Sequence, residues 1–285
     1  MWWMTLTDKL ERATFLDPVA KAATGVVCAV LPPGKVKDAL HGRWLGHAVH
    51  PLVVAVPIGM WSGAVLLDLT GGAASRTAAR RLVGAGVLLV APSAASGLAD
   101  WSELGAFERP KRVGLVHALV NVATTVLYGA SWLARRRGDH ERGRNLALAG
   151  VGTLAVGGYL GGHLAYSQGV AVNRNADEQK QPRDWTDAAA ATDVEEGQLL
   201  RVDVDGQAVV LARQGGEIYA MGATCSHYGA PLETGELSGG CLVCPWHASR
   251  FRLRDGSVAR GPATSPQTSY RVRTQGSRLQ VQVRL

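Results

Sequence analysis

The chain of 285 residues is long enough for two domains, and 47% of its residues are hydrophobic. Its formal net charge is +7, but the basic residues cluster beside apolar stretches, as in Arg135-Arg136-Arg137. That placement is typical of segments that flank a membrane, so it indicates a lipid bilayer as partner and argues against nucleic acid. Residues 51–164 are dominated by Ala, Val, Leu and Gly, whereas residues 173–285 have an ordinary polar composition.

The first segment, residues 1–45, contains one apolar run at residues 18–31. This run is too short to cross a bilayer, and it stops at Pro32-Pro33. We therefore expect an N-terminal interfacial segment, in which an amphipathic helix lies on the membrane surface or packs against the rest of the chain.

Four apolar stretches follow within residues 46–166, at residues 51–69, 82–99, 113–133 and 146–165. A helix rises about 1.5 Å per residue, so each stretch is just long enough to cross a hydrocarbon core of about 30 Å. A bundle buried in water is the alternative, but its helices would show a polar stripe, which these stretches mostly lack. The sequence predicts an all-α four-helix transmembrane bundle.

An even number of crossings would place both ends of this bundle on one membrane face. Several polar side chains gather toward that face, and they are His47, His50, Asp100, His117 and His163. Because ionisable groups are costly in a membrane, they usually mark a site. Three interpretations stay open: imidazoles that ligate a b-type haem, a site that binds and deprotonates a quinol, or histidines that only hydrogen-bond backbone near the lipid headgroups.

The second half begins with residues 167–195, a polar stretch without an apolar period, which predicts a linker. From residue 196 onward the pattern is typical of strands. Leu199–Val204 and Ala208–Ala212 flank the turn Asp205-Gly206, which predicts a hairpin. Further short strands follow, so residues 196–285 are predicted to form an all-β antiparallel sandwich.

Two short motifs, Cys225-Ser226-His227 and Cys244-Pro245-Trp246-His247, each supply one thiolate and one imidazole, with sixteen residues between them. Two thiolates and two imidazoles could hold a tetrahedral zinc ion. However, zinc fingers usually pair their cysteines in one knuckle and their histidines on one helix. Mixed motifs on two facing loops instead suit a two-iron cluster, with both thiolates on one iron and both imidazoles on the other.

The residues around both motifs resemble the Rieske iron–sulfur family over about residues 194–285; the matching runs are residues 225–232, residues 244–251 and Gly261-Pro262. The resemblance implies a [2Fe-2S] cluster, with Cys225 and Cys244 on one iron and His227 and His247 on the other. It also implies that Gly261-Pro262 belongs to a loop that shields the cluster.

The sequence departs from the respiratory members of that family, which carry an extra cysteine in each motif, joined as a disulfide. Ala230 and Trp246 occupy these places, so no such disulfide can form. Ser249 stands where a hydroxyl bonds a bridging sulfide, but Phe251 stands where a tyrosine hydroxyl bonds a cysteine sulfur. Losing a donor should lower the reduction potential within the Rieske range of about −150 to +300 mV. Cys241 is either a further thiolate or a small buried residue, and the second interpretation is favoured.

The run from Gly46 to Pro51, followed by Pro57-Ile58-Gly59, resembles an uncharacterised bacterial family of small four-helix membrane domains, some of which are fused to a Rieske domain. This resemblance covers about residues 40–165 and implies an integral protein of the bacterial cell membrane. Lys and Arg are equally numerous on the two predicted faces, so the positive-inside rule barely decides the orientation. The dense basic run at Arg135–Arg137 weakly favours an external iron–sulfur domain.

These features predict a membrane-anchored Rieske protein that transfers single electrons between a membrane redox partner and another protein. Haem or quinol in its own bundle is a candidate for the membrane partner. The alternative is a redox-sensing or assembly subunit without turnover. We expect an electron carrier rather than a self-contained enzyme, and not an oxygenase catalytic subunit, because no large domain follows to present a two-His, one-carboxylate iron site. The oligomeric state is left open.

Overall fold

The computed structural model describes residues 2–178 and 180–284, which divide into two compact units. The chain up to Pro32 together with Val49–Val170 forms a helical unit, and Pro33–Ala48 together with the chain from Ala171 onward forms a β unit. The chain therefore enters the β unit once before the helical bundle and again after it.

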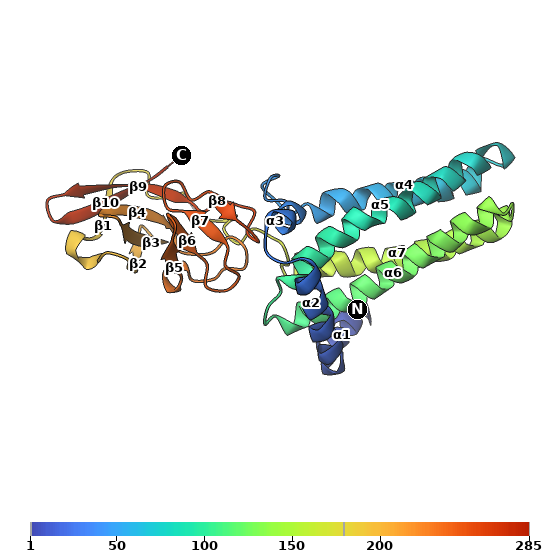
Figure 1. Ribbon diagram of the computed structural model, residues 1–285, viewed down its shortest axis with the longest axis horizontal. Helices are drawn as coiled ribbons and strands as arrows, with labels where there is room; N and C mark the ends of the chain where they lie inside the picture. Colours follow the sequence, from blue (N-terminus) through green and yellow to red (C-terminus); the bar gives the residue numbers. More distant parts are fainter. Residues whose placement is uncertain (1, 179, 285) are drawn as a thin grey trace. The chain divides into compact units, whose positions relative to one another are not determined.

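The helical unit is built around a four-helix bundle (Figure 1). Its helices are α4 (His50–Thr70), α5 (Arg76–Ser102), α6 (Glu108–Arg136) and α7 (His140–Gly162), followed by a π-helical turn at His163–Ser167. Each packs against the next in the chain, and α7 also contacts α4. Two shorter helices, α1 (Trp2–Glu11) and α2 (Asp17–Val30), pack against this bundle. Arg112 of α6 anchors α2 through paired hydrogen bonds to the Asp17 carboxylate.

The outer faces of the bundle are apolar and exposed, as at Leu66, Leu88 and Val126, which are 61%, 76% and 63% exposed. Exposed apolar surface of this extent suits lipid rather than water. Among the described residues, three helical stretches are long and apolar enough to cross a membrane: His50–Thr70, Ala73–Ser102 and Glu108–Arg136. The expectation of four therefore holds for three by this criterion. The last helix, α7, carries seven glycines, which lower its mean hydropathy.

The β unit contains two antiparallel sheets. The larger has the strand order β1-β10-β9-β4-β3-β2, and the smaller has the order β5-β6-β7-β8. The larger sheet comprises β1 (Thr186–Ala190), β2 (Leu199–Val204), β3 (Gln207–Gln214), β4 (Glu217–Gly222), β9 (Ser269–Gln275) and β10 (Arg278–Val283). The smaller comprises β5 (Glu236–Ser238), β6 (Cys241–Val243), β7 (Arg250–Arg252) and β8 (Val258–Arg260). This confirms the predicted antiparallel β domain.

The predicted hairpin is the pair β2 and β3, which pair from Leu199 opposite Ala212 to Val204 opposite Gln207. The turn residues Asp205 and Gly206 have φ of 52° and 75°, the positive angles that a tight hairpin turn requires at both positions. Both faces of β3 are covered, because Val210 and Ala212 join one buried core while Val209 and Leu211 join a second. The first of these, here called the inter-sheet core, also contains side chains from β6 and β7.

Two expected boundaries differ from the structure. The segment predicted as a linker, residues 167–195, contains β1 and a 3-10 turn at Ala191–Asp193, and β1 pairs with β10. β1 has the sequence Thr-Asp-Ala-Ala-Ala, which contains no alternation of large apolar and polar residues, and it is an edge strand of the larger sheet. The segment predicted as one interfacial piece, residues 1–45, is divided: α1 and α2 belong to the helical unit, but α3 (Lys35–His41) belongs to the β unit.

Candidate metal centre

The four predicted ligands lie on two loops of the β unit. Cys225 and His227 follow β4, while Cys244 and His247 lie between β6 and β7. An antiparallel bridge between Thr224 and Pro231 closes the base of the first loop, and the pairing of β6 with β7 closes the second. Each loop is thus supported by strand pairing on both sides of its ligands.

The two loops have the same internal hydrogen bonds. In the first, Cys225 N–H donates to the Ala230 carbonyl at 2.9 Å and the Cys225 carbonyl accepts from Gly229 at 2.8 Å. In the second, Cys244 N–H donates to the Ser249 carbonyl at 2.8 Å and the Cys244 carbonyl accepts from Ala248 at 3.1 Å. Both patterns join residue i to residues i+5 and i+4, so the loops present their ligands with matching backbone geometry.

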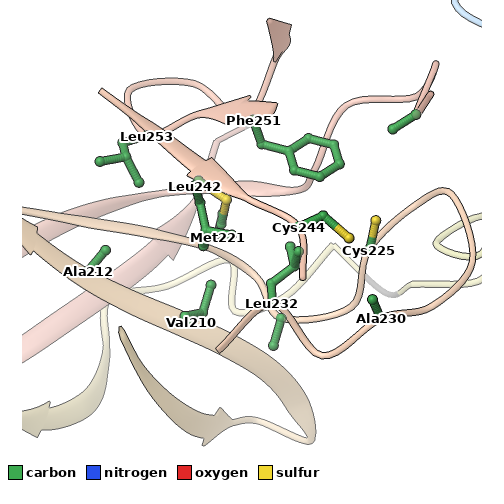
Figure 2. Close-up of a cluster of buried hydrophobic side chains, with 12 residues drawn as sticks. Val210, Ala212, Met221, Cys225, Ala230, Leu232, Leu242, Cys244, Phe251 and Leu253 are labelled. Carbon is green, nitrogen blue, oxygen red and sulfur yellow. The ribbon is translucent and has the colours of Figure 1, made fainter. Parts of the chain in front are cut away.

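The two cysteine side chains are buried and adjacent. Cys225 is 1% exposed and Cys244 is 2% exposed, and Figure 2 shows their sulfur atoms close together beside the inter-sheet core. A hydrogen bond between the thiols lowers the pKa of Cys244, with help from the backbone N–H groups of Trp246 and His247. The same bond, together with burial, raises the pKa of Cys225. The two thiols are therefore in electrostatically different surroundings.

The two imidazoles lie nearer the surface than the thiols. The rings of His227 and His247 have centroids 5.0 Å apart and are nearly perpendicular, and both residues are partly exposed. Tyr228 packs edge-on against His227 at 4.4 Å. Trp246, beside His247, is 49% exposed. The arrangement therefore has a buried sulfur pair and a more accessible nitrogen pair.

A third loop, here called the cover loop, spans residues 261–268 and begins with the cis peptide bond Gly261–Pro262. Its Ala263 N–H donates to the Ser249 hydroxyl oxygen at 2.9 Å. Its Ser265 carbonyl accepts from the Ser226 hydroxyl at 2.7 Å. The cover loop is thus hydrogen-bonded to both ligand loops.

The donor chemistry fits a two-iron cluster with two ligands on each iron. Soft thiolates from one residue of each loop are paired in the interior, and imidazoles from the other residue are paired toward the surface. Across residues 2–178 and 180–284, no three His, Cys, Asp or Glu side chains converge as they would around a single metal ion. The four predicted ligands thus lie as one pair of thiols and one pair of imidazoles.

Four residues near the ligands in the sequence are buried: Ala230, Cys241, Ser249 and Phe251. Phe251 is fully buried in the inter-sheet core, so its ring packs near the thiols without offering a hydroxyl. Ser249 is also fully buried, and its hydroxyl oxygen accepts a hydrogen bond from Ala263. Ala230 is buried in the same core. Cys241 is a buried free cysteine in β6, as the favoured interpretation expected.

The histidines predicted toward one membrane face each have contacts of their own. His50 Nδ1 donates to the Ser93 carbonyl at 3.0 Å, and His117 Nδ1 donates to the Gly157 carbonyl at 2.9 Å. Asp100 lies on α5, the helix that also carries Ser93. His163 instead contacts the Glu11 carboxylate of α1 at 2.8 Å, while His47 is exposed and belongs to the β unit.

Sequence reasoning missed the polar residues that connect the loops. Ser226 and Ser265 join the first ligand loop to the cover loop, and Asn175 donates to the Thr224 carbonyl at 2.9 Å. Asn175 lies in the segment predicted as a linker. Its neighbours are polar, and polar side chains that bond loop carbonyls carry no periodic signal, so nothing in the pattern marked it.

Comparison with known proteins gives two family matches. A model described as Rieske [2Fe-2S] domain matches residues 184–271, and one described as predicted membrane protein (DUF2231) matches residues 46–174. The two matches do not overlap, and they leave the first 45 residues outside both families.

Several relatives match the iron–sulfur region. The chain is 41% identical over 91 residues to the 3-phenylpropionate/cinnamic acid dioxygenase ferredoxin subunit of Shigella boydii serotype 4 (strain Sb227), covering 32% of this chain and 85% of that one. It is 35% identical over 97 residues to the naphthalene 1,2-dioxygenase system ferredoxin component of Pseudomonas aeruginosa, covering 34% and 93%. Apoptosis-inducing factor 3 of Homo sapiens is 34% identical over 102 residues, which cover 35% of this chain but only 17% of that protein.

Proposed function

Because the chain belongs to the Rieske [2Fe-2S] family and carries a predicted membrane protein domain ahead of that domain, we propose that it is a membrane-anchored one-electron carrier. It would pass electrons between a redox partner in the membrane and another protein. The single observation that carries the proposal is the pair of matched loops, with buried thiols and more exposed imidazoles. The bound [2Fe-2S] cluster supplies the one-electron chemistry.

The residues of this chain would divide the work between them. Cys225 and Cys244 would hold one iron, and their burial suits a thiolate pair. His227 and His247, which are partly exposed, would hold the other iron and would lie on the side that a redox partner can approach. Ser249 would donate its hydroxyl to a bridging sulfide. The partly exposed Trp246 beside His247 gives that partner an aromatic contact.

The names of two ferredoxin relatives describe them as components of dioxygenase systems. By analogy, we propose an oxygenase or a similar redox protein as the partner on the water side.

On the membrane side, a quinol fits the contacts better than a b-type haem. The reason is that His117 Nε2 already accepts from Asn121 at 3.0 Å, and the His50 and His117 rings pack closely against Gly97 and Gly161.

The test is a set of spectra from the purified full chain. We expect the paramagnetic signal of a Rieske cluster in the reduced protein, and we expect Cys225→Ser to abolish it because one iron loses a ligand. The matched control is Cys241→Ser, which changes a buried cysteine outside the ligand set and should keep the signal. Retention of the signal in Cys225→Ser would refute the ligand assignment.

The membrane partner needs a separate measurement. Reduced-minus-oxidised spectra of haem-replete preparations should show no haem bands if the bundle binds a quinol rather than haem. Addition of a short-chain quinol should then reduce the cluster in the wild-type chain. We expect His117→Leu to slow this reduction at least tenfold. Haem bands that disappear in the same variant would instead identify haem as the bundle's redox group.

A further inference from the structure

The segment from Pro33 to Ala48, here called the strap, lies between α2 and α4 in the chain but packs in the β unit. Residues 33–45 lie outside both family matches. The strap contains α3, and three of its polar residues, Lys37, Asp38 and His41, are 5%, 9% and 3% exposed. The burial of these polar side chains shows that α3 packs against other parts of the β unit.

The end of α3 forms a compact cap. Gly42 has φ of 88°, its N–H donates to the Ala39 carbonyl, and Arg43 N–H donates to the Asp38 carbonyl at 3.1 Å. These are the two hydrogen bonds of a Schellman motif, which needs a residue such as glycine at positive φ. The motif turns the chain back, so the Arg43 guanidinium lies 3.5 Å from the Asp38 carboxylate.

The strap is hydrogen-bonded to the cover loop and to the strand before it. Asp38 Oδ1 accepts from the Gly261 N–H at 3.1 Å, and Arg43 donates to the Ala259 carbonyl at 3.1 Å. At the other end of the strap, the Gly46 carbonyl accepts from the Ser265 hydroxyl at 3.5 Å. These contacts fall within residues 259–265, on both sides of Pro262.

The same short stretch is bonded to both ligand loops, through Ser249 with Ala263 and Ser226 with Ser265. Gly261, which contacts the strap, is two positions before Ala263, and Ser265 itself contacts both the strap and a ligand loop. A shift of Asp38 would move Gly261, and with it the cover loop that is hydrogen-bonded to both ligand loops.

The Asp38 side chain is only 12% exposed, so its charge is weakly screened by water. A negative charge near an iron–sulfur cluster disfavours the more negative reduced form and lowers the reduction potential. The burial of this carboxylate is compensated by its ion pair with Arg43 and by the hydrogen bond from the Gly261 N–H.

We propose that the strap holds the cover loop closed over the iron–sulfur site, and that Asp38 is a positioning residue that also lowers the reduction potential of the cluster. The inference rests on the proposed function, since it assumes the cluster. It adds to that function a contribution from a part of the chain that neither family match includes.

The experiment compares Asp38→Asn and Asp38→Ala in the full chain with its cluster. Asp38→Asn keeps an acceptor oxygen for Gly261 but removes the charge, so we expect the equilibrium constant for reduction to rise about threefold to tenfold. A tenfold rise is about 59 mV for one electron. Asp38→Ala should raise the equilibrium constant for reduction by a similar factor. It should also speed amide hydrogen exchange over residues 257–266 at least tenfold, because the cover loop loses its hydrogen bond to Asp38. The conservative Asn variant should keep exchange near the wild-type rate.

Asp184→Asn is the matched control, because it removes an exposed carboxylate from the same unit and should change neither quantity. Unchanged exchange in Asp38→Ala would overturn the proposal, and so would an unchanged potential in both Asp38 variants. If Asp38→Ala does not accumulate, Arg43→Gln replaces it, since it removes the hydrogen bond to Ala259. A wild-type chain without a Rieske signal would instead refute the proposed function.

Discussion

At the scale of single residues, the two ligand loops are alike in backbone but not in sequence. Gly229 and Ala248 occupy the same place, four residues after the ligand cysteine, and both have positive φ, at 76° and 55°. Glycine adopts this conformation freely, whereas alanine pays a steric penalty of about 1 kcal/mol. The second loop therefore tolerates a residue that its conformation disfavours, and Ala248 is exposed, so packing does not explain it.

This difference gives a matched pair of substitutions. We expect Gly229→Ala to lower the free energy of unfolding of the iron–sulfur domain by about 1 kcal/mol, and Ala248→Gly to raise it by about 0.5 kcal/mol. Space is not limiting at Gly229, where an added methyl group would meet only Thr224 Cγ2 at 4.0 Å. Denaturant unfolding, followed by loss of the visible spectrum of the cluster, measures both. A Gly229→Ala variant with the same free energy of unfolding as the wild type would contradict the predicted steric penalty at this position.

Glu178 gives a second residue-scale prediction, in pH dependence. Burial raises the pKa of its carboxyl above the ordinary value of 4.5, partly offset by the hydrogen bond from Thr268. A raised folded-state pKa stabilises the fold below the unfolded pKa, and that stabilisation is lost as pH rises through the folded pKa. We expect Glu178→Gln to be more stable than wild type at pH 8, with the difference vanishing near pH 4. Melting curves across this range test it, with the exposed Asp177→Asn as control.

At the scale of elements, the end of the bundle opposite the histidines is held by a buried ion pair between helices. Arg135 of α6 forms paired hydrogen bonds with the Asp68 carboxylate of α4, and their side chains are 1% and 7% exposed. Arg135 Nε also donates to Ser131, whose hydroxyl donates to the Gly143 carbonyl of α7 at 2.6 Å. The pair thus connects three helices.

Breaking one partner leaves a buried charge alone, so Arg135→Leu should destabilise the bundle by about 3–5 kcal/mol. The double variant Arg135→Leu with Asp68→Leu should recover much of this loss, because no unpaired charge remains. Thermal unfolding in detergent measures the effect, and Arg137→Leu, at an exposed position next to the same helix end, is the control. An equal loss in the double variant would show that the charge itself is not the cause.

The elements also indicate how much could be predicted from the sequence. Alternation and turn residues predicted the hairpin at Asp205-Gly206, and apolar length predicted α4, α5 and α6, because each pattern reflects local burial. The ligand residues were predictable since their chemistry requires Cys and His at fixed places. The packing of the strap in the β unit was not predictable, because Asp38 and Arg43 contact residues more than 200 positions away in the chain. The haem or quinone site at the membrane histidines stays a prediction, and the contact of His163 with Glu11 could not be predicted because 152 residues separate the two in the chain.

At the scale of the whole molecule, the strap restricts how the chain can insert into a membrane. The strap precedes α4, and the residues it bonds, from Ala259 to Ser265, follow α7. Hydrogen bonds cannot form across about 30 Å of hydrocarbon. Both partners must lie on one face, so the number of crossings between them must be even. We therefore expect α7 to span the bilayer despite its glycines.

Labelling of single cysteines checks this, in a chain where the exposed Cys28 is replaced by Ser. Arg137→Cys, between α6 and α7, and Glu236→Cys, on the β unit, should react with an impermeant thiol reagent from opposite sides of a vesicle. Reaction from the same side would mean an odd number of crossings. If the expected result holds, membrane topology is a condition for completing the iron–sulfur domain, because an α7 that failed to insert would leave the strap and the cover loop in different compartments.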